Sequence, residues 1–497
     1  GHLRLAIIDL SPAGHQPMAS ASGRLVLTFN GEIYNHGELR AQLEEEGRAP
    51  AWRGQSDTET LLAGFDAWGI EATLARTVGM FALAVWDRET RRLTLARDRL
   101  GEKPLYYGWQ GSGRERAFLF GSELRALEAH PAFDGKIDRG ALVQLMRHGH
   151  VGEANAIFAG IAKLPPGCLA VVQAGEAPGI RRYWDGAAIA AQPPGGAAQD
   201  PEAAADTLEA LLMEAVAGQM VSDVPLGAFL SGGIDSSTVV ALMQRQSALP
   251  VRTFSIGFDE PRYNEAEFAK AVATHLGTQH TELYVGAGEL RDVVPELPGL
   301  FDEPFADSSQ IPTTLVSRLA RHEVTVALSG DGGDELFCGY DRYRQGASLM
   351  RWVRTVPRPL RAAAAGAVRA VPAGAWDRLV DPLRPVPVGK EPNGQRLHRL
   401  ADYARSAGVD DLHRKLVSRW RFPEAAVPGA SEPASLLDTG AVVAGERPEA
   451  ERMMSLDMLT YLPDDILSKV DRASMSVALE ARAPFLDHRV VEFAWNL

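Results

Sequence analysis

Two glycine-rich segments of the sequence carry residue types that can bind phosphate groups. In the first, Leu230 to Ser237 (LSGGIDSS), an apolar run ends at two glycines and a helical pattern begins. Glycines let backbone N–H groups approach an anion, the start of a helix adds positive potential, and serine hydroxyls donate further hydrogen bonds. The segment lacks the GxxxxGK[ST] pattern of a P-loop, so it favours release of pyrophosphate over cleavage of a γ-phosphate.

The second segment, Ser329 to Glu335 (SGDGGDE), again places glycines and carboxylates after an apolar run. A lone Gly-Gly pair is often only a strand-to-helix turn, here capped by Asp235. Two such segments at the carboxyl ends of parallel strands would instead converge on one magnesium-nucleotide site. Asp235 and Asp334 offer the hard oxygen ligands that Mg²⁺ prefers and would bridge it to phosphate oxygens.

Both segments lie where strand and helix patterns alternate, which predicts an α/β domain with a parallel sheet at 203–497. Helices are expected at 203–220, 236–246, 264–276 and 313–321, and strands at 226–230, 251–256, 281–285 and 324–328. Ligands of such sheets bind beyond the carboxyl ends of the strands, which is where the glycine-rich segments fall.

The first 185 residues have a different pattern, with short β-like runs and few helices, which predicts an α+β domain. Strands are expected at 3–10, 25–29, 81–86 and 93–96, and helices at 38–46 and 58–68. Residues 186–202 are rich in Ala, Gly, Pro and Gln and too poor in large apolar side chains to pack. We therefore expect an interdomain linker at 186–202.

The composition narrows the class of protein. The chain has 497 residues, enough for two to four domains. Its 51 Lys and Arg against 64 Asp and Glu give a net charge of −13, which disfavours nonspecific binding to nucleic acid or an anionic membrane. No run approaches the roughly 18 apolar residues of a membrane span. The two cysteines form no CxxC pair, which favours a reducing cytoplasm. Small molecules are the expected partners.

Taken together, the motifs resemble the class B, glutamine-hydrolysing asparagine synthetases, and the match spans nearly the whole chain. In the C-terminal part it rests on SGGIDSS at 231–237, FSIGF at 254–258, SGDGGDE at 329–335 and EARAPFLD at 480–487. In the N-terminal part it rests on RLAIIDL at 4–10, FNGEIYN at 29–35 and SDTE at 56–59. The resemblance implies an α+β glutaminase domain of the αββα N-terminal-nucleophile (Ntn) type, followed by an ATP-pyrophosphatase domain of the adenine nucleotide alpha hydrolase-like type.

For the N-terminal domain, the resemblance implies a glutamine pocket. Arg4 would pair with the α-carboxylate of glutamine, and Asp57 with Glu32 would receive its α-ammonium group. The Asn30 side chain and the Gly31 N–H would form the oxyanion hole. The remaining pocket residues would be Leu5, Ala6, Ile7 and Ile8. Without the resemblance, Arg4 and Asp57 are surface charges and Asn30-Gly31 is a hairpin turn.

For the C-terminal domain, the resemblance implies ATP and Mg²⁺ binding. Contacts to the adenosine part of ATP would come from Leu230, Ile256, Ser329 and Gly330. The loop would contribute Ser231, Gly232, Gly233, Asp235, Ser236 and Ser237, and Mg²⁺ would bind Asp235 and Asp334. Asp331 would be the catalytic carboxylate that helps to form or aminolyse an acyl-adenylate. The implied reaction converts ATP, L-aspartate, L-glutamine and water into L-asparagine, L-glutamate, AMP and pyrophosphate.

The sequence departs from the family pattern in three places. The family's nucleophile is an N-terminal cysteine, and this sequence starts at Gly1, beyond that point. It also ends shortly after His488, before the region where the family places a catalytic lysine, so we expect a longer natural protein. Asp331 stands where well-known members carry glutamate. Cys168 and Cys338 cannot replace the nucleophile; both are expected as buried apolar residues, Cys338 where glycine would be typical.

Three other functions remain open on the sequence. The acceptor could be another carboxylate, such as a sugar uronic acid or a peptide. An ATP-dependent cyclase that resembles β-lactam synthetases would have no use for glutamine-pocket residues. A non-catalytic scaffold or storage protein would have no use for two magnesium-capable aspartates. Members of the resembled family are often dimers, so a homodimer is consistent with the resemblance.

Overall fold

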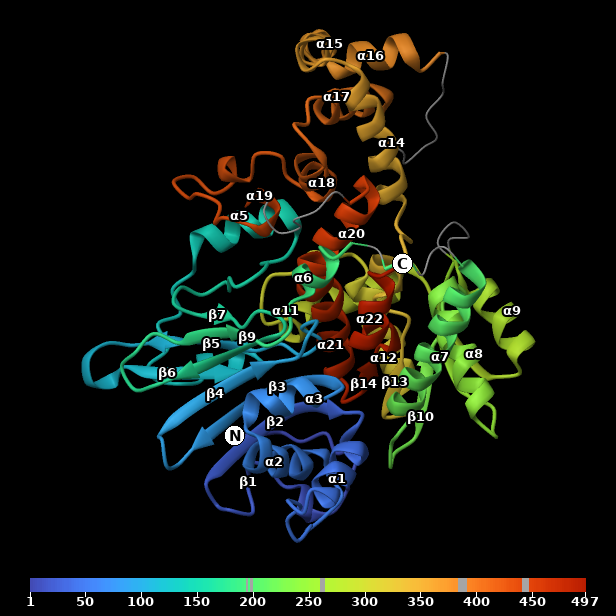
Figure 1. Cartoon of the computed structure of the whole chain (residues 1–497). Coiled ribbons are helices and arrows are strands. Elements are labelled where there is room, and N and C mark those ends of the chain that lie inside the picture. Colours follow the sequence, from blue (N-terminus) through green and yellow to red (C-terminus); the bar gives the residue numbers. More distant parts are fainter. Residues whose placement is uncertain (194, 197–199, 260–263, 383–390, 440–446) are drawn as a thin grey trace.

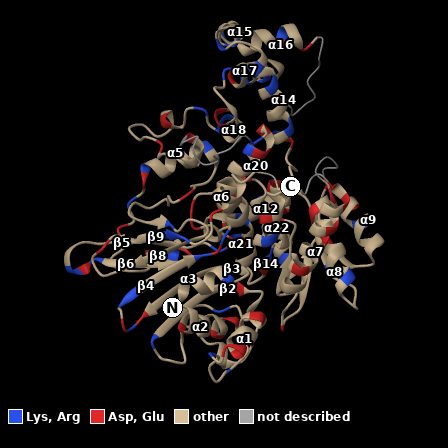
Figure 2. Cartoon of the chain, viewed as in Figure 1, with Lys and Arg blue, Asp and Glu red and all other residues tan. Residues whose placement is uncertain are grey.

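The computed structural model describes residues 1–193, 195–196, 200–259, 264–382, 391–439 and 447–497. It has an N-terminal body of two antiparallel sheets and a C-terminal body around one parallel sheet (Figure 1). Four helices, α14 (Asp341–Thr355), α15 (Arg358–Ala370), α16 (Ala373–Val380) and α17 (Asn393–Ala404), project away from both bodies. Basic and acidic residues are intermingled over the two bodies (Figure 2).

The larger N-terminal sheet has six strands in the order β1-β2-β3-β4-β8-β9, and neighbouring strands are antiparallel. They are β1 (Met18–Ala19), β2 (Leu25–Ile33), β3 (Gly79–Asp87), β4 (Arg92–Arg97), β8 (Cys168–Val172) and β9 (Gly179–Arg182). Because side chains alternate along a strand, Phe81 and Leu83 of β3 belong to the core beneath the helices, while Ala82 and Ala84 face a second sheet.

The N-terminal layers run helix, sheet, sheet, helix. The first helical layer contains α1 (His36–Glu45), α2 (Asp57–Trp68) and α3 (Ile70–Arg76). The second sheet, in the order β6-β5-β7, comprises β5 (Tyr106–Gln110), β6 (Ala117–Gly121) and β7 (Ala162–Lys163). Its outer face packs on α4 (Leu124–Glu128) and α5 (Arg139–His148) through Tyr106, Leu127 and Ala141. This order confirms the predicted αββα architecture.

The C-terminal body is built on a fully parallel sheet in the order β12-β11-β10-β13-β14. Its strands are β10 (Leu226–Phe229), β11 (Arg252–Phe258), β12 (Gln279–Val285), β13 (Val326–Leu328) and β14 (Glu480–Arg482). Helices α7 (Pro201–Gln219), α8 (Ile234–Gln246), α9 (Ala266–Leu276) and α22 (His488–Ala494) share one hydrophobic cluster with Ala228 of β10 and Val326 of β13. On the other face, α12 (Gln310–Arg321) packs against Phe254 and Ala327 and contacts α21 (Leu467–Met475). The predicted α/β class is confirmed.

The remaining helices connect these parts. They are α6 (Gly186–Ala190), α10 (Ala287–Val293), α11 (Leu297–Leu300), α13 (Gly333–Leu336), α18 (Val409–Val417), α19 (Leu436–Thr439) and α20 (Glu449–Leu459). A π-helical turn at Leu462–Ile466 leads from α20 toward α21. Across the part of the chain that the structure describes, no helix combines the length and apolar character that a membrane span requires.

Three local expectations differ from the structure. Residues 3–10 form no strand, because the Arg4 guanidinium binds the backbone oxygens of Ile8 (2.9 Å) and Asp9 (2.8 Å) and the chain turns there. Within the expected linker, α6 buries Ala190, while residues 194 and 197–199 lie outside the described residues. Cys338 is half-buried and has φ 60°, the left-handed conformation that makes glycine typical at this position. Cys168 is buried, as predicted.

Candidate active site

A cavity of about 840 Å³ opens at the carboxyl ends of β10 and β11. Leu230, Ser231 and Ile256, three of the predicted ATP contacts, line it. The backbone N–H of Leu230 donates to the oxygen of Phe254 at 2.9 Å, which joins the end of β10 to β11. A mostly apolar cavity of this size with a few hydroxyl groups suits a nucleoside.

The facing wall of this cavity was not predicted from the sequence. It consists of Ser308, Ser309, Ile311, Pro312 and Val316. The Lys469 ammonium of α21 donates to the Ser309 hydroxyl at 2.8 Å and lies 3.0 Å from the Asp307 carboxylate. Residues 301–309 contain no glycine motif, so their types gave no signal for nucleotide binding.

Hydrogen bonds between two of its own serines hold the first glycine-rich loop. The hydroxyls of Ser231 and Ser236 lie 2.9 Å apart, and the Ser231 N–H donates to the Ser236 hydroxyl at 3.2 Å. Gly232 has φ 79°, and a Cβ there would lie 2.6 Å from the backbone nitrogen of Ala269. The Ser237 hydroxyl is buried without a hydrogen-bond partner among the described residues. A phosphate at this helix start would satisfy it.

The second glycine-rich loop packs directly on the first. A Cβ on Gly330 would lie 2.7 Å from the backbone nitrogen of Ser236. A Cβ on Gly333 would lie 2.4 Å from the carboxyl carbon of Asp235. Any larger side chain would push the loops apart, so the glycines are what allow the two segments to meet.

Three carboxylates gather where the loops meet. Burial, followed by the charges of Asp334 and Asp331, raises the pKa of Asp235 to about 6. Burial and the nearby Asp331 also raise the pKa of Asp334. A cation between these carboxylates would relieve their repulsion. No cluster of three or more metal-ligating side chains occurs within the described ranges. Asp235 and Asp334 are the residues that would hold Mg²⁺, which would supply positive charge beside a bound phosphate.

Asp331 lies at the junction of the two bodies. It lines a cavity of about 20 Å³ together with Ser329, and with Glu102 and Lys103 of the N-terminal body. Burial raises the pKa of Asp331, and the positive charge of Lys469 opposes that rise. The predicted catalytic carboxylate therefore faces groups from both domains.

A second small cavity, of about 40 Å³, gathers the predicted glutamine-binding residues. Its lining includes Arg4, Leu5, Ile7, Ile8, Asn30, Gly31, Glu32 and Asp57, but not Ala6. Asn30 and Gly31 lie inside β2, paired with β3, and not in a hairpin turn. Gly31 has φ 147°, and a Cβ there would lie 2.0 Å from the Met80 oxygen. At about 40 Å³, the cavity is too small to hold a glutamine molecule.

Two buried carboxylates meet at the base of this cavity. Asp57 accepts the Ile33 N–H at 3.0 Å and the Thr58 N–H at 2.7 Å. Burial and the adjacent Asp57 raise the pKa of Glu32, and burial raises the pKa of Asp57. Arg482 of β14, which the sequence did not single out, lies 3.5 Å from Glu32. An ammonium group of a bound amino acid would further neutralise this pair.

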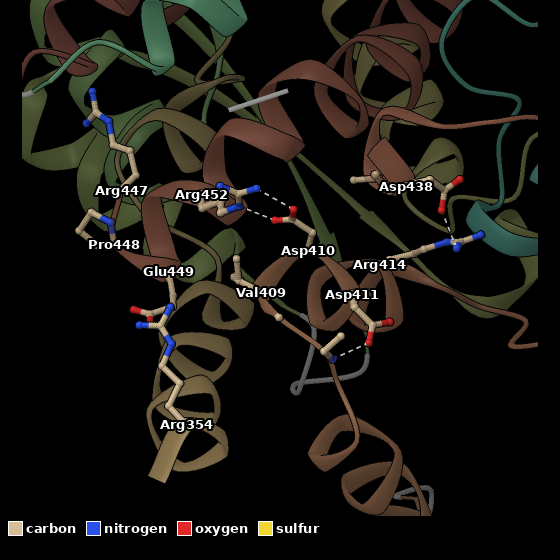
Figure 3. Close-up of a pocket in the computed structure, with 13 residues that line it drawn as sticks. Arg354, Val409, Asp410, Asp411, Arg414, Asp438, Arg447, Pro448, Glu449 and Arg452 are labelled. Carbon is tan, nitrogen blue, oxygen red and sulfur yellow. Dashed lines mark hydrogen bonds and ion pairs between the residues drawn. The ribbon is translucent and has the colours of Figure 1, made fainter. Parts of the chain in front are cut away.

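A larger cavity, of about 1030 Å³, lies among α14, α18 and α20 (Figure 3). Its charged lining comprises Arg354, Arg414, Arg447 and Arg452 with Asp410, Asp411, Asp438 and Glu449. The close-up shows Arg452 paired with Asp410, and Arg414 paired with Asp438. Because positive and negative groups balance, this cavity is a poor match for a polyphosphate.

Comparison with known protein families assigns a domain family to each of the two bodies. The model of the glutamine amidotransferase domain matches residues 1–184, and the asparagine synthase model matches residues 207–497. A glutamine amidotransferase domain is thus followed by a parallel-sheet domain whose cavity suits a nucleoside. This combination defines a two-domain glutamine amidotransferase. The chain belongs to the asparagine synthase family.

Individual relatives match between 69% and 100% of this chain. A protein of Mycobacterium tuberculosis (strain H37Rv) is 36% identical over 502 residues, which cover 100% of this chain and 73% of the relative. Asparagine synthetase [glutamine-hydrolyzing] 1 of Bacillus subtilis (strain 168) is 31% identical over 99% of this chain and 73% of its own. Amidase chry2 of Gibberella zeae is 28% identical over 69% of this chain and 51% of its own.

Proposed function

We propose that this protein is a glutamine-dependent asparagine synthetase. Asp331 carries the proposal, because it belongs to the second glycine-rich loop and lines a cavity together with Glu102 and Lys103 of the N-terminal body. That cavity and the glutamine-pocket cavity share Lys103 as a wall residue. An enzyme that releases ammonia at one site and consumes it at another needs such adjacency, and ammonia would pass between these two cavities.

In the glutaminase half, Arg4 would hold the α-carboxylate of glutamine, and Asp57 with Glu32 would hold its α-ammonium group. Asn30 and the Gly31 N–H would donate to the oxygen that becomes negative when the amide is attacked. The family's N-terminal cysteine would supply the nucleophile, and hydrolysis of the resulting thioester would release glutamate. Ammonia is the other product.

In the synthetase half, the acceptor carboxylate would attack the α-phosphorus of ATP and expel pyrophosphate. Leu230 and Ile256 would contact the adenosine, and the serine hydroxyls of the first loop would contact phosphate oxygens. Mg²⁺ bound at Asp235 and Asp334 would neutralise phosphate charge. Ammonia would then attack the acyl carbon, AMP would leave, and Asp331 would accept the proton that the nitrogen loses.

The domain bounds, the cellular location and the assembly state are part of the same proposal. The glutaminase domain would comprise residues 1–185, the connection residues 186–202 and the synthetase domain residues 203–497. Both cysteines are free thiols, which supports a reducing cytoplasm as the location. The protein would work as a homodimer on small-molecule substrates.

The direct experiment incubates the complete gene product with glutamine, aspartate, ATP and Mg²⁺. Asparagine, glutamate, AMP and pyrophosphate are quantified together by mass spectrometry. Equal amounts of asparagine, AMP and pyrophosphate would support the proposal. Glutamate without asparagine would refute aspartate as the acceptor.

One observation favours a second acceptor class. Asp331 is one methylene shorter than the glutamate of well-known family members, which leaves more room beside the acyl group. A sugar uronic acid or a peptide carboxylate would then be amidated by the same steps. A cyclase is disfavoured, because Arg4, Asn30 and Asp57 gather in one pocket that a cyclase would not need.

A further inference from the structure

The side chain of Asn30 is held by a residue outside the predicted glutamine pocket. Its Nδ2 donates to the Ser122 hydroxyl at 3.0 Å. Ser122 lies between β6 and α4, in neither of the elements that carry the glutamine-binding residues. The hydrogen bond therefore links the proposed oxyanion donor to a separate segment of the N-terminal body.

This contact fixes the position of the carboxamide, with its Nδ2 directed at the Ser122 hydroxyl. A carboxamide carries two N–H donors and one carbonyl acceptor. With one N–H bound to the Ser122 hydroxyl, the second remains available for the oxyanion. If the hydroxyl were removed, the carboxamide would lose this anchor and could turn away from the place where the negative charge develops, so its second N–H would stabilise the oxyanion less.

The segment around Ser122 is held in turn by the C-terminal body. Arg472 of α21 donates to the Ser122 backbone oxygen at 2.6 Å. The buried carboxylate of Asp302 accepts the Leu124 N–H at 2.9 Å and the Arg125 guanidinium at 2.8 Å. Arg472 and Asp302 lie 3.3 Å apart, so they form one clamp on residues 122–125.

Helix α21, which carries Arg472, and the loop that carries Asp302 also extend to the 840 Å³ nucleotide cavity. Lys469, one helical turn before Arg472 on α21, contacts Asp307 and Ser309. Asp307 and Ser309 follow Asp302 on the same loop, and Ser309 lines the cavity. A change at the cavity wall would thus reach the clamp on Ser122 through two short connections, the turn of α21 between Lys469 and Arg472 and the loop between Asp302 and Ser309.

We propose that Ser122 is the positioning residue for the Asn30 carboxamide, and that Arg472 with Asp302 couples this position to the nucleotide site. This inference rests on the proposed function, since it concerns the oxyanion hole of the glutaminase half. It adds a residue that touches no substrate and whose effect passes through Asn30. It also adds a defined path between the two sites.

The first test replaces Ser122 in the complete gene product and measures glutamine hydrolysis. For Ser122→Ala we expect kcat to fall about 10-fold with KM within twofold of the unsubstituted protein, because one neutral hydrogen bond orients a donor that acts in the transition state. Ser122→Thr, which keeps the hydroxyl, should restore kcat. Synthesis with ammonia in place of glutamine should be unchanged, as should both activities of Ser112→Ala, an exposed serine of the same domain.

Each outcome of this test is decisive. An unchanged kcat in Ser122→Ala, or a rise in KM alone, would overturn the positioning role. A lack of glutamate formation by the unsubstituted protein would instead overturn the proposed function and this inference with it. A variant that loses both glutamine- and ammonia-dependent activity would show a structural role and would also contradict the proposal.

The second test addresses the coupling. The kcat for glutamine hydrolysis is measured with and without ATP, Mg²⁺ and aspartate, and we expect these ligands to change it about fivefold. In Arg472→Gln and Arg472→Lys the ratio should approach one, while ammonia-dependent synthesis persists. The control is Arg181→Gln, an exposed arginine of β9, which should keep the ratio. A ratio of one in the unsubstituted protein, or an unaltered ratio in both Arg472 variants, would overturn the coupling.

Discussion

The guanidinium of Arg482 lies 3.5 Å from the carboxylate of Glu32, although the two residues come from different domains. Arg482 also donates to Glu480 at 2.8 Å and to the backbone oxygens of Gln219 (2.6 Å) and Val221 (2.9 Å). Its side chain is fully buried. A cation of the parallel sheet thus lies against a carboxylate of the proposed glutamine pocket, which ties the integrity of that pocket to the domain junction.

Replacing Arg482 by Met should therefore destabilise the protein strongly. The substitution keeps similar volume but leaves buried carboxylates without their cation, a change expected to lower the free energy of unfolding by about 3 kcal/mol. Urea denaturation followed by fluorescence measures it. Arg181→Met, at an exposed position of β9, should change it by less than about 0.5 kcal/mol. Equal effects at both positions would show that the buried cation is dispensable.

The Glu32–Asp57 pair should make glutamine binding depend on pH. Burial raises the pKa of both carboxyls above their usual values, so the pair retains a proton at pH values where exposed carboxylates have lost theirs. An ammonium group binds best when the pair is fully ionised. We therefore expect the KM for glutamine to fall as pH rises from about 5 toward 8.

The matched control for this dependence is Glu32→Gln, which removes one titrating group and should flatten the KM profile while raising KM itself. Synthesis with added ammonia separates effects on the second site. A KM for glutamine that is constant across this pH range in the unsubstituted protein would contradict the shared-proton interpretation.

Much of this fold could be predicted because local patterns coincide with the elements that form. The runs at 226–230 and 251–256 became β10 and β11, since short apolar stretches bounded by polar turns have few other stable outcomes in a buried sheet. The strand β14, at Glu480–Arg482, is only three residues long and left no periodic signal.

Within the candidate site, the sequence could single out only the segments whose backbones approach each other closely. The glycines at 232–233 and 330–333 mark such loops, because close approach requires the absence of a Cβ. Lys103, Ser122 and Ser309 act through contacts with residues far away in the sequence. No spacing rule records those contacts, so only the three-dimensional arrangement reveals them.

Asp235 should make Mg²⁺ binding and stability depend on pH in opposite ways. Its pKa of about 6 lies above the value of about 4 expected in the unfolded chain, so the folded protein holds the extra proton between these values. By linkage, stability without metal falls as pH rises from about 4 to 6 and then levels off. Mg²⁺ with ATP should raise the melting temperature by several degrees at pH 7.5 and by less at pH 5.5.

Asp235→Asn provides the matched variant for that prediction. It removes the charge with little change in volume, so it should abolish the Mg²⁺-dependent rise in melting temperature and remove the loss of stability between pH 4 and 6. Glu265→Gln, which also lines the 840 Å³ cavity but belongs to neither glycine-rich loop, should preserve both effects. Retention of the full Mg²⁺ effect in Asp235→Asn would place the metal elsewhere.

Asp331 permits a test of which half-reaction its carboxylate serves. Asp331→Asn keeps the shape of the side chain but cannot accept a proton, so asparagine formation should fall by about 10²-fold or more, whether the nitrogen comes from glutamine or ammonia. Glutamine hydrolysis should persist within a few fold, because the glutamine-pocket cavity does not include Asp331. Pyrophosphate exchange into ATP in the presence of aspartate then separates the steps: retained exchange assigns the carboxylate to aminolysis, and lost exchange assigns it to adenylation.

Asp331→Glu, which adds the methylene of the well-known synthetases, should retain at least a tenth of the activity if aspartate is the acceptor. If Asp331→Asn makes asparagine at the unsubstituted rate, the carboxylate has no part in the chemistry.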